Sequence, residues 1–333
     1  VSPKPTMVRL VSIMFFLLLV MLVLYIKSAL NYKITGKGDI EERTSIPVLG
    51  EIIQAETDSP LVMKDGNRSL IAEQFRGLRT SLGYMGDDSG KNKILISSSI
   101  PGEGKSFVST NIAISYALTG QKSVLIESDM RKPNIAKHFN ISRRIGLSTY
   151  LNGNSTLEEI VIPTHIDNLY VIAAGPIPPN PVELMMNGKY QHLIEQLGEL
   201  YDHVVIDCPP IGLVTDAEIL GKWVDACVFI VRHQHTPKQS IGNLLDRLYK
   251  GEKFNRMAIV MNGLKGGISG YGYGYGYGYG NGYGYGYGYG NYGGYGYGYY
   301  GDEKKPKRVW RKEAYKVLVI PFFAFLGIKS KVR

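Results

Sequence analysis

A short glycine-rich segment has the spacing of a phosphate-binding loop. Residues 99–106 read Ser-Ile-Pro-Gly-Glu-Gly-Lys-Ser, after an apolar run and before a predicted helix over 105–119. Glycines let backbone amides converge on phosphate oxygens, and the helix N-terminus adds partial positive charge. In this pattern the lysine reaches the β- and γ-phosphates and the last serine offers its hydroxyl to Mg²⁺. Ser99 replaces the usual first glycine. The sequence therefore predicts a site for ATP and Mg²⁺, with nucleotide contacts from Pro101, Gly102, Glu103, Gly104, Lys105, Ser106 and Phe107.

Two apolar runs end in carboxylates that could serve the same site. Residues 204–207 read Val-Val-Ile-Asp, and residues 124–129 read Val-Leu-Ile-Glu-Ser-Asp. Taken singly, each acid could simply cap a helix. The carboxyl ends of parallel strands open onto one crevice, where carboxylates can hold a metal and accept a proton from an incoming hydroxyl. We expect metal ligands at Ser106, Asp129 and Asp207, and catalytic roles for Lys105, Glu127, Asp129, Arg131 and Asp207.

The C-terminal part of the chain has an unusual density of tyrosines. Residues 270–301 alternate tyrosine with glycine and hold 14 of the chain's 24 tyrosines. Glycine spacers keep the backbone mobile and leave the phenol hydroxyls in water, so no core can form there. A nucleotide site on the same chain suggests an enzyme whose substrate is its own C-terminus. The expected phosphoacceptors are Tyr271, Tyr273, Tyr275, Tyr277, Tyr279, Tyr283, Tyr285, Tyr287, Tyr289, Tyr292, Tyr295, Tyr297, Tyr299 and Tyr300.

From residue 93 onward, apolar runs alternate with helical patterns. Continuous apolar strands that alternate with helices indicate a parallel sheet covered by helices on both faces. The expected fold class is α/β, a P-loop NTPase sheet preceded by one transmembrane helix and followed by a disordered Tyr/Gly tail. The expected strands are 94–97, 123–126, 169–173, 203–206, 226–231 and 257–261, and the expected helices are 68–84, 105–119, 182–199, 215–222 and 238–249.

Residues 10–26 are almost entirely apolar, which is near the lower limit of about 17–25 residues for a membrane-spanning helix. A cleaved signal peptide is the alternative, but no small-residue cleavage site follows. More Lys and Arg follow the segment than precede it, which places its C-terminal side in the cytoplasm, at the inner membrane. Because the chain starts at Val1 rather than Met, we expect it to be a fragment, a processed product or an incomplete gene model.

These features divide the chain into six parts. We expect an extracytoplasmic stub with prolines over 1–9, a transmembrane helix over 10–30, a cytoplasmic linker over 31–67, a P-loop catalytic domain over 68–265, the tyrosine-rich tail over 266–301 and a basic and apolar extension over 302–333.

The formal net charge of +9 is concentrated at the end of the chain. Residues 302–333 hold ten Lys and Arg against three acids, which leaves +2 for the rest. A basic tail of this kind meets anionic lipid or phosphorylated partners more often than it reads nucleic acid, and no motif resembles a nucleic-acid module. We therefore expect a membrane partner and no nucleic acid. Two cysteines exclude a disulfide framework and fit a reducing compartment.

Three motifs together carry a family resemblance. Residues 97–106, 127–133 (Glu-Ser-Asp-Met-Arg-Lys-Pro) and 205–210 (Val-Ile-Asp-Cys-Pro-Pro) closely resemble the bacterial tyrosine autokinases of capsule and exopolysaccharide systems. That family combines a P-loop with a D-x-D motif and a third motif ending I-D-x-P-P. Residues 73–79 and 174–181 are similar to it too. Glu127 stands where the family has aspartate, in a place whose implied role is to position or deprotonate the acceptor tyrosine.

The resemblance implies an ATP-dependent protein-tyrosine kinase that works as a homo-oligomeric ring, in which one subunit phosphorylates the tail of its neighbour. It also implies partnership with the polysaccharide polymerase and export machinery, which the kinase regulates, and with a cognate tyrosine phosphatase. By the same resemblance Asn262 would contact adenine, and the subunit contact would include Glu73, Arg76 and Arg79.

Two other readings remain open. A switch ATPase of the partition or septum-placement type shares the same sheet and loop, but the tyrosine tract has no purpose in it. A structural Gly/Tyr-rich protein, whose tail associates by aromatic contacts, would leave the nucleotide site unexplained.

Overall fold

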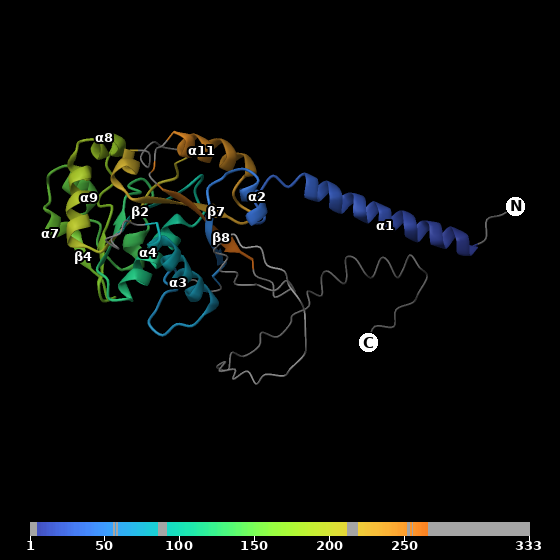
Figure 1. Ribbon diagram of the computed structural model, residues 1–333, viewed down its shortest axis with the longest axis horizontal. Helices are drawn as coiled ribbons and strands as arrows, with labels where there is room; N and C mark the ends of the chain where they lie inside the picture. Colours follow the sequence, from blue (N-terminus) through green and yellow to red (C-terminus); the bar gives the residue numbers. More distant parts are fainter. Residues whose placement is uncertain are drawn as a thin grey trace, which may run out of the picture. The chain divides into compact units, whose positions relative to one another are not determined.

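A single mixed sheet organises the protein. The computed structural model describes residues 5–55, 57, 59–85, 92–211, 219–251, 254 and 256–265. Within them the strand order is β1-β8-β7-β2-β6-β3-β5-β4, and every neighbouring pair is parallel except β4 with β5 (Figure 1). The strands are β1 Val48–Ile53, β2 Asn92–Ser98, β3 Ser123–Glu127, β4 Val161–Pro163, β5 Leu169–Ile172, β6 His203–Asp207, β7 Ala226–Arg232 and β8 Met257–Leu264.

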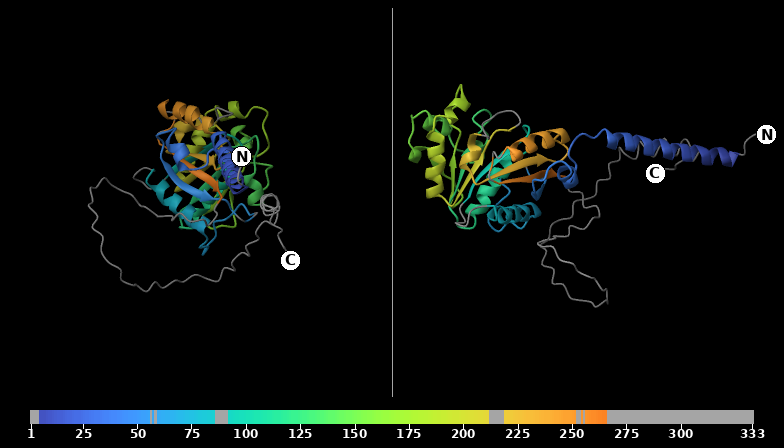
Figure 2. Two further views of the ribbon diagram at one scale, coloured as in Figure 1. Left: turned by 90° about the vertical axis from the view of Figure 1, so that its right-hand side faces the viewer. Right: turned by 45° about the horizontal axis from the view of Figure 1, so that its top comes forward.

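Helices cover both faces of this sheet, as the continuous apolar strands predict (Figure 2). Phe75 and Leu78 of α3 and Ile112 of α4 belong to the core cluster on one face, and Leu193 of α9 and Leu245 of α11 belong to the core cluster on the other. The helices are α1 Pro5–Ala29, α2 Lys37–Glu41, α3 Leu70–Gly83, α4 Lys105–Ala117, α5 Ile135–His138, α6 Leu147–Leu151, α7 Leu157–Ile160, α8 Pro181–Met185, α9 Lys189–Leu200, the 3₁₀ turn η1 Gly221–Trp223 and α11 Lys238–Lys250.

The α/β fold class and all six expected strands are confirmed, but one expected helix is divided. The sequence predicts a helix over 182–199, whereas the structure has α8 and α9. Gly188 lies between them with a φ of 81°, a left-handed conformation that ends one helix and lets the chain start the next. Of the expected helix 215–222, only residues 219–222 are described, and η1 begins there.

The expected linker over 31–67 is corrected by the structure, because much of it belongs to the folded domain. Ile34, Ile40 and Ile46 are buried in the core cluster that also contains α11. Residues 48–53 form β1, which pairs in parallel with β8 at the edge of the sheet. The domain therefore begins some thirty residues earlier than the apolar pattern of α3 predicts.

The chain just after α1 is clasped to the segment between β7 and α11. Ile34 N donates to Thr236 O at 2.9 Å, and Lys238 N donates to Tyr32 O at 2.8 Å. Lys238 Nζ also lies 2.6 Å from an Asp39 carboxylate oxygen. We call residues 32–39 together with 234–238 the clasp.

One helix among the described residues is long and apolar enough to cross a membrane. Arg9–Ile26 of α1 has a mean hydropathy of 2.6, and none of this window is buried against the protein. Its apolar side chains therefore need another environment, and a bilayer supplies one.

Candidate active site

The phosphate-binding loop joins the carboxyl end of β2 to the first turn of α4. Gly102 and Gly104 have φ values of 85° and 93°, a region that side chains with a Cβ rarely adopt. The loop opens onto a pocket of about 320 Å³. This pocket is lined by Pro101, Gly102, Gly104, Lys105, Ser106, Phe107, Asp129, Arg131, Lys132, Asn134, Pro209 and Pro210.

Three neighbouring strands bring the site together. In the order β2-β6-β3, Ile96 of β2 is level with Asp207, and Asp207 is level with Glu127 of β3. The loop after β2 and the acids that end β6 and β3 therefore lie at one edge of the sheet. The strand ends therefore meet at one edge of the sheet, as the sequence analysis assumed when it placed the loop and the two acids in one site.

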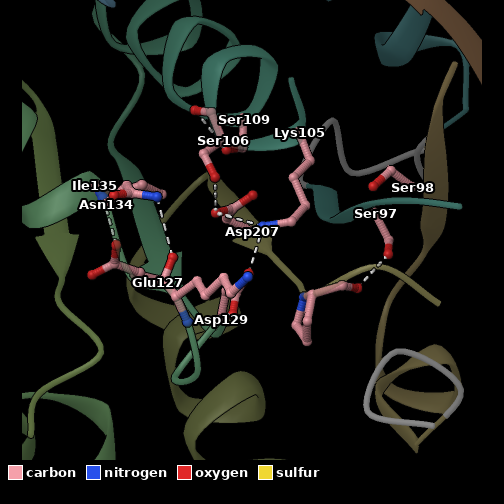
Figure 3. Close-up of polar contacts among 12 residues, drawn as sticks. Ser97, Ser98, Lys105, Ser106, Ser109, Glu127, Asp129, Asn134, Ile135 and Asp207 are labelled. Carbon is pink, nitrogen blue, oxygen red and sulfur yellow. Dashed lines mark hydrogen bonds and ion pairs between the residues drawn. The ribbon is translucent and has the colours of Figure 1, made fainter. Parts of the chain in front are cut away.

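Lys105 lies between two carboxylates. Its Nζ is 2.7 Å from Asp129 Oδ2 and 3.9 Å from Asp207 Oδ2 (Figure 3). Burial alone would lower the pKa of Lys105, but the charges of Asp207 and Asp129 outweigh it and raise this pKa. The lysine is therefore held as a cation at the inner end of the pocket.

The two carboxylate oxygens of Asp207 differ in their contacts. Oδ2 accepts a 2.6 Å hydrogen bond from Ser106 Oγ, whereas Oδ1 is buried and has no hydrogen-bond partner among the residues that the structure describes. Burial raises the pKa of Asp207 to about 6, although Lys105 and Ser106 act to lower it. An orphaned buried carboxylate oxygen beside a serine hydroxyl fits a Mg²⁺ ion. Mg²⁺ is usually held by one or two carboxylates together with phosphates and water, so this donor set suffices.

Glu103 supports the loop from behind and does not line the pocket. Its buried carboxylate accepts hydrogen bonds from Ser99 Oγ at 2.8 Å, from Ile100 N at 2.9 Å and from the Thr236 hydroxyl. Burial raises the pKa of Glu103, and these hydrogen bonds oppose that rise. Glu103 therefore shapes the loop, and its side chain is not placed to meet a nucleotide.

Further contacts on the loop come from residues that the sequence analysis does not single out. Arg232 Nη1 donates to Gly102 O at 2.7 Å, and His235 Nε2 lies 3.1 Å from Pro101 O. With Thr236, both belong to the end of β7 and the clasp. The signal that could have found them is the polar run Arg-His-Gln-His-Thr directly after a buried strand.

Glu127 and Asp129 are placed differently. Asp129 lines the pocket and also accepts a 3.0 Å hydrogen bond from Lys132 N. Glu127 is completely buried, does not line the pocket, and accepts hydrogen bonds from the backbone amides of Ile135 and Ala174. Arg131 and Lys132 are exposed at the mouth of the pocket.

Comparison with known proteins identifies the family. Residues 91–255 match the model of the AAA domain family. The putative tyrosine-protein kinase CapB of Staphylococcus aureus is 35% identical over 212 residues, which cover 62% of this chain and 93% of CapB. This chain belongs to the bacterial tyrosine-protein kinases. The tyrosine-protein kinase YwqD of Bacillus subtilis is 36% identical over 60% of this chain and 83% of its own length.

Solved structures of this kinase family have the same fold. The crystal structure of the chimerical protein CapA2B2 matches with a TM-score of 0.64 at 34% identity, over 69% of this chain and all of that chain. The kinase domain of the Escherichia coli tyrosine kinase ETK matches with a TM-score of 0.66 at 29% identity, over 73% of this chain and 99% of that domain. Some kinases of the family are longer: the chain covers 38% of the tyrosine-protein kinase ptk of Acinetobacter johnsonii.

Asn262 of this kinase touches the phosphate-binding loop. Its Nδ2 donates to Glu103 O at 2.9 Å, its side chain is 7% exposed, and it does not line the pocket. In this conformation the side chain holds the loop. The expected adenine contact stays a prediction.

The residues expected at the subunit contact lie along α3. Glu73 is exposed and pairs with Arg76 at 2.6 Å. Arg79 is partly buried, and its Nη1 donates to Ser115 O at 2.6 Å, near the end of α4. The Arg79 side chain therefore links α3 to α4, whereas the Glu73 side chain faces solvent. The fourteen expected acceptor tyrosines lie outside the described residues.

Proposed function

We propose that this kinase transfers the γ-phosphoryl group of ATP to the tyrosines of its own C-terminal tract. The observation that carries the proposal is the pocket in which Lys105, Asp129 and Ser106 converge, on a chain that also holds 14 clustered tyrosines. A pocket for phosphates with a carboxylate at its inner end suits a hydroxyl acceptor. Such a long Tyr/Gly tract has no role in an enzyme that only hydrolyses ATP.

The loop supplies the groups that would hold the nucleotide. The backbone from Gly102 to Ser106 presents amides at the N-terminus of α4, where phosphate is favoured by partial positive charge. Lys105 adds a full charge next to the transferred group. Ser106 and Asp207 would hold Mg²⁺, which when bound neutralises charge on the phosphates.

Asp129 is the carboxylate that faces an incoming acceptor. It lines the pocket together with Arg131, Lys132 and Pro209, none of which belongs to the phosphate-binding loop. In the reaction the phenol oxygen bonds to the γ-phosphorus, ADP leaves, and the phenolic proton passes to a base. With ATP bound, Lys105 would turn to the phosphates, and Asp129 Oδ2, which it now contacts at 2.7 Å, would then be placed to receive that proton. Positioning and charge neutralisation supply most of the catalysis.

The test is mass spectrometry of the full chain in detergent after incubation with Mg-ATP. Lys105→Met should abolish phosphorylation in the tract, while the wild type should carry several phosphates between Tyr271 and Tyr300. Lys122→Met is the matched control, because Lys122 is exposed and lies outside the pocket. ATP turnover without phosphate on the tract would favour a switch ATPase.

We further propose that phosphorylation occurs between subunits of a ring. A Gly-rich chain of about 30 residues has a root-mean-square span of roughly 30 Å, enough to visit a neighbouring site. Mixing a Lys105→Met chain with an active chain whose tract tyrosines are all phenylalanine tests this. Phosphate on the Lys105→Met chain would demonstrate transfer between chains, and its absence would contradict the proposal.

Phosphorylation of the tract should also weaken the ring. Residues 270–301 carry no charged side chain, and each phosphate adds about −1.5 to −2 charges. Repulsion between tracts, or their capture by the basic residues after 302, would then favour dissociation. Light scattering should give a smaller mass for the phosphorylated protein than for the phosphatase-treated protein. Equal masses would contradict the proposal that phosphorylation dissociates the ring.

The cellular role follows from the same proposal. With α1 in the inner membrane and the catalytic domain in the cytoplasm, the kinase would regulate a polysaccharide polymerase and export machinery, opposed by a cognate tyrosine phosphatase. The similarity to CapB and to a putative tyrosine-protein kinase in the cps region of Klebsiella pneumoniae supports this role. Cells with Lys105→Met in place of the wild type should make polymer of altered amount or length, and an unchanged polymer would contradict it.

A further inference from the structure

Glu127 is turned away from the pocket. The two oxygens of its buried carboxylate accept hydrogen bonds from backbone amides, one from Ile135 N and the other from Ala174 N at 3.1 Å. Figure 3 shows the carboxylate directed at Ile135, on the side away from Lys105 and Asp207. Both carboxylate oxygens are therefore engaged within the protein.

The two amides belong to separate parts of the chain. Ile135 is the first residue of α5 and ends the loop that follows Asp129, whereas Ala174 lies just beyond β5. Ala174 O in turn accepts a 3.0 Å hydrogen bond from Ser148 N, near the start of α6. A single carboxylate thus joins the end of β3 to the loop 130–134 and to the segment after β5.

The loop that Glu127 holds forms one wall of the pocket. Arg131, Lys132 and Asn134 all line it. Lys132 N donates to Asp129 Oδ1 at 3.0 Å, while Asp129 Oδ2 contacts Lys105. A shift of this loop would therefore move the pocket wall and disturb the orientation of Asp129.

We propose that Glu127 is a positioning residue, which fixes the loop 130–134 and with it the acceptor side of the pocket. Asp129 already lines the pocket, whereas the Glu127 carboxylate would have to turn to reach it. That turn would leave two buried amides without a partner, which is costly. The claim about an acceptor rests on the proposed kinase function, but the claim about the loop does not.

Hydrogen exchange of the full chain in detergent tests the positioning role without any activity. In Glu127→Gln the amide oxygen can keep one hydrogen bond, but the NH₂ group faces the other backbone N–H. We expect amides near Ile135 and Ala174 to exchange about tenfold faster, the equivalent of one lost hydrogen bond. Glu73→Gln is the matched control, because it makes the same chemical change at an exposed carboxylate on α3 and touches neither Glu127 contact.

Kinetics with an added Gly-Tyr repeat peptide separate the two roles for Glu127. Positioning predicts that Glu127→Gln raises KM for the peptide by a larger factor than it lowers kcat. A proton-accepting role predicts a fall in kcat of about 100-fold or more with native exchange rates, and that result would overturn the proposal.

A second variant covers the case in which Glu127→Gln does not fold. Glu127→Asp keeps a carboxylate but is one methylene shorter, so it should not reach both amides and should also show faster exchange. Native exchange in both variants would overturn the positioning role. A wild-type chain that fails to phosphorylate the peptide, yet shows the expected exchange in the variants, would reject the kinase proposal and leave the positioning role standing.

Discussion

A Cβ atom added to Gly104 would lie 2.0 Å from Nδ2 of Asn262. The same nitrogen donates to the carbonyl of Glu103, so β8 and the phosphate-binding loop are in contact, and a Cβ at position 104 would displace the Asn262 amide from this hydrogen bond. The φ of Gly104 is 93°, which adds backbone strain for any other residue. The loop conformation thus depends on a residue of the last strand.

Gly104→Ala should therefore abolish binding of a fluorescent ATP analogue and destabilise the protein. Gly120→Ala is the matched control, because Gly120 has a φ of 82° but an added Cβ would have no atom of the described residues within 4 Å. The control should lose about 1–2 kcal/mol of unfolding free energy from backbone strain alone. Gly104→Ala should lose more, as measured by urea unfolding. Equal losses and retained binding would contradict the steric account.

Removal of Lys105 should destabilise the protein more at pH 8 than at pH 5. Burial raises the pKa of Asp207 from 3.8 to about 6, so protonated Asp207 favours the folded state at low pH and this contribution is lost as the pH rises through 6. Lys105 acts to lower that pKa. In Lys105→Met, ionised Asp207 is left buried without its cation, which is costly at pH 8 and relieved by protonation at pH 5.

Urea unfolding at both pH values, with EDTA present, measures this difference. Lys122→Met serves again as the control, and its unfolding free energy should stay close to that of the wild type at both pH values. A Lys105→Met penalty that does not change with pH would argue against coupling between Lys105 and Asp207.

The clasp should be sensitive to acid. Burial alone would raise the pKa of Asp39, but hydrogen bonds from Lys238 and Thr35 lower it from 3.8 to about 2. A lower folded-state pKa means that the ionised carboxylate stabilises the fold above pH 4, and that this contribution is lost as the pH falls toward 2. Asp39→Asn should therefore cost about 1–2 kcal/mol at pH 7 and much less near pH 2.5.

Unfolding curves of the wild type and of Asp39→Asn at the two pH values test this prediction. Asp65→Asn, at an exposed aspartate, provides the reference for a change of charge without a partner from the clasp. If Asp39→Asn and Asp65→Asn behave alike at pH 7, the contact between Asp39 and Lys238 does not stabilise the fold.

Substitutions of Arg79 and Glu73 should have different effects, because Arg79 contributes to the stability of the fold and Glu73 is expected at the subunit contact. Arg79→Ala removes hydrogen bonds to Ser115 O at 2.6 Å and to Ser115 Oγ at 3.2 Å, so we expect a loss of about 1–3 kcal/mol of unfolding free energy. Glu73→Ala removes an exposed ion pair with Arg76 and should change the unfolding free energy by less than about 1 kcal/mol.

Light scattering on the same two variants then reports on the ring. Glu73→Ala should lower the oligomer mass while the fold stays intact, if Glu73 lies at the proposed subunit contact. An unchanged mass for this folded variant would exclude Glu73 from that contact.

The central strands and the loop could be predicted because their signals are local. Strands buried on both faces appear as continuous apolar runs, and glycines with a following lysine and serine mark the loop. The sequence does not predict β1, because it follows Pro47 and its apolar run is interrupted by Gly50 and Glu51. Its extended state comes from pairing with β8, a partner about 200 residues away. No pattern within Val48–Ile53 reveals that partner.

For the active site, the sequence predicts which residues lie close together but not how each side chain is oriented. Parallel topology places Asp207 and Glu127 at the same edge of the sheet, and the pairing of β6 with β3 makes them neighbours. The direction of the Glu127 carboxylate, however, is decided by the amide of Ala174, which is 47 residues away. Asn262 is similar, because its contact with Glu103 spans 159 residues. Such orientations depend on the packed structure.

The clasp leaves very little slack after the apolar helix. Leu30 and Asn31 are the residues between the end of α1 and Tyr32, whose carbonyl is bound by Lys238. If α1 is embedded in a bilayer, the catalytic pocket stands at a nearly fixed height above it, and acceptors must arrive within that thin layer. The encounter is then a reaction in two dimensions. Its rate would depend on the number of copies per unit area of membrane, and not on their number per unit volume of the cell.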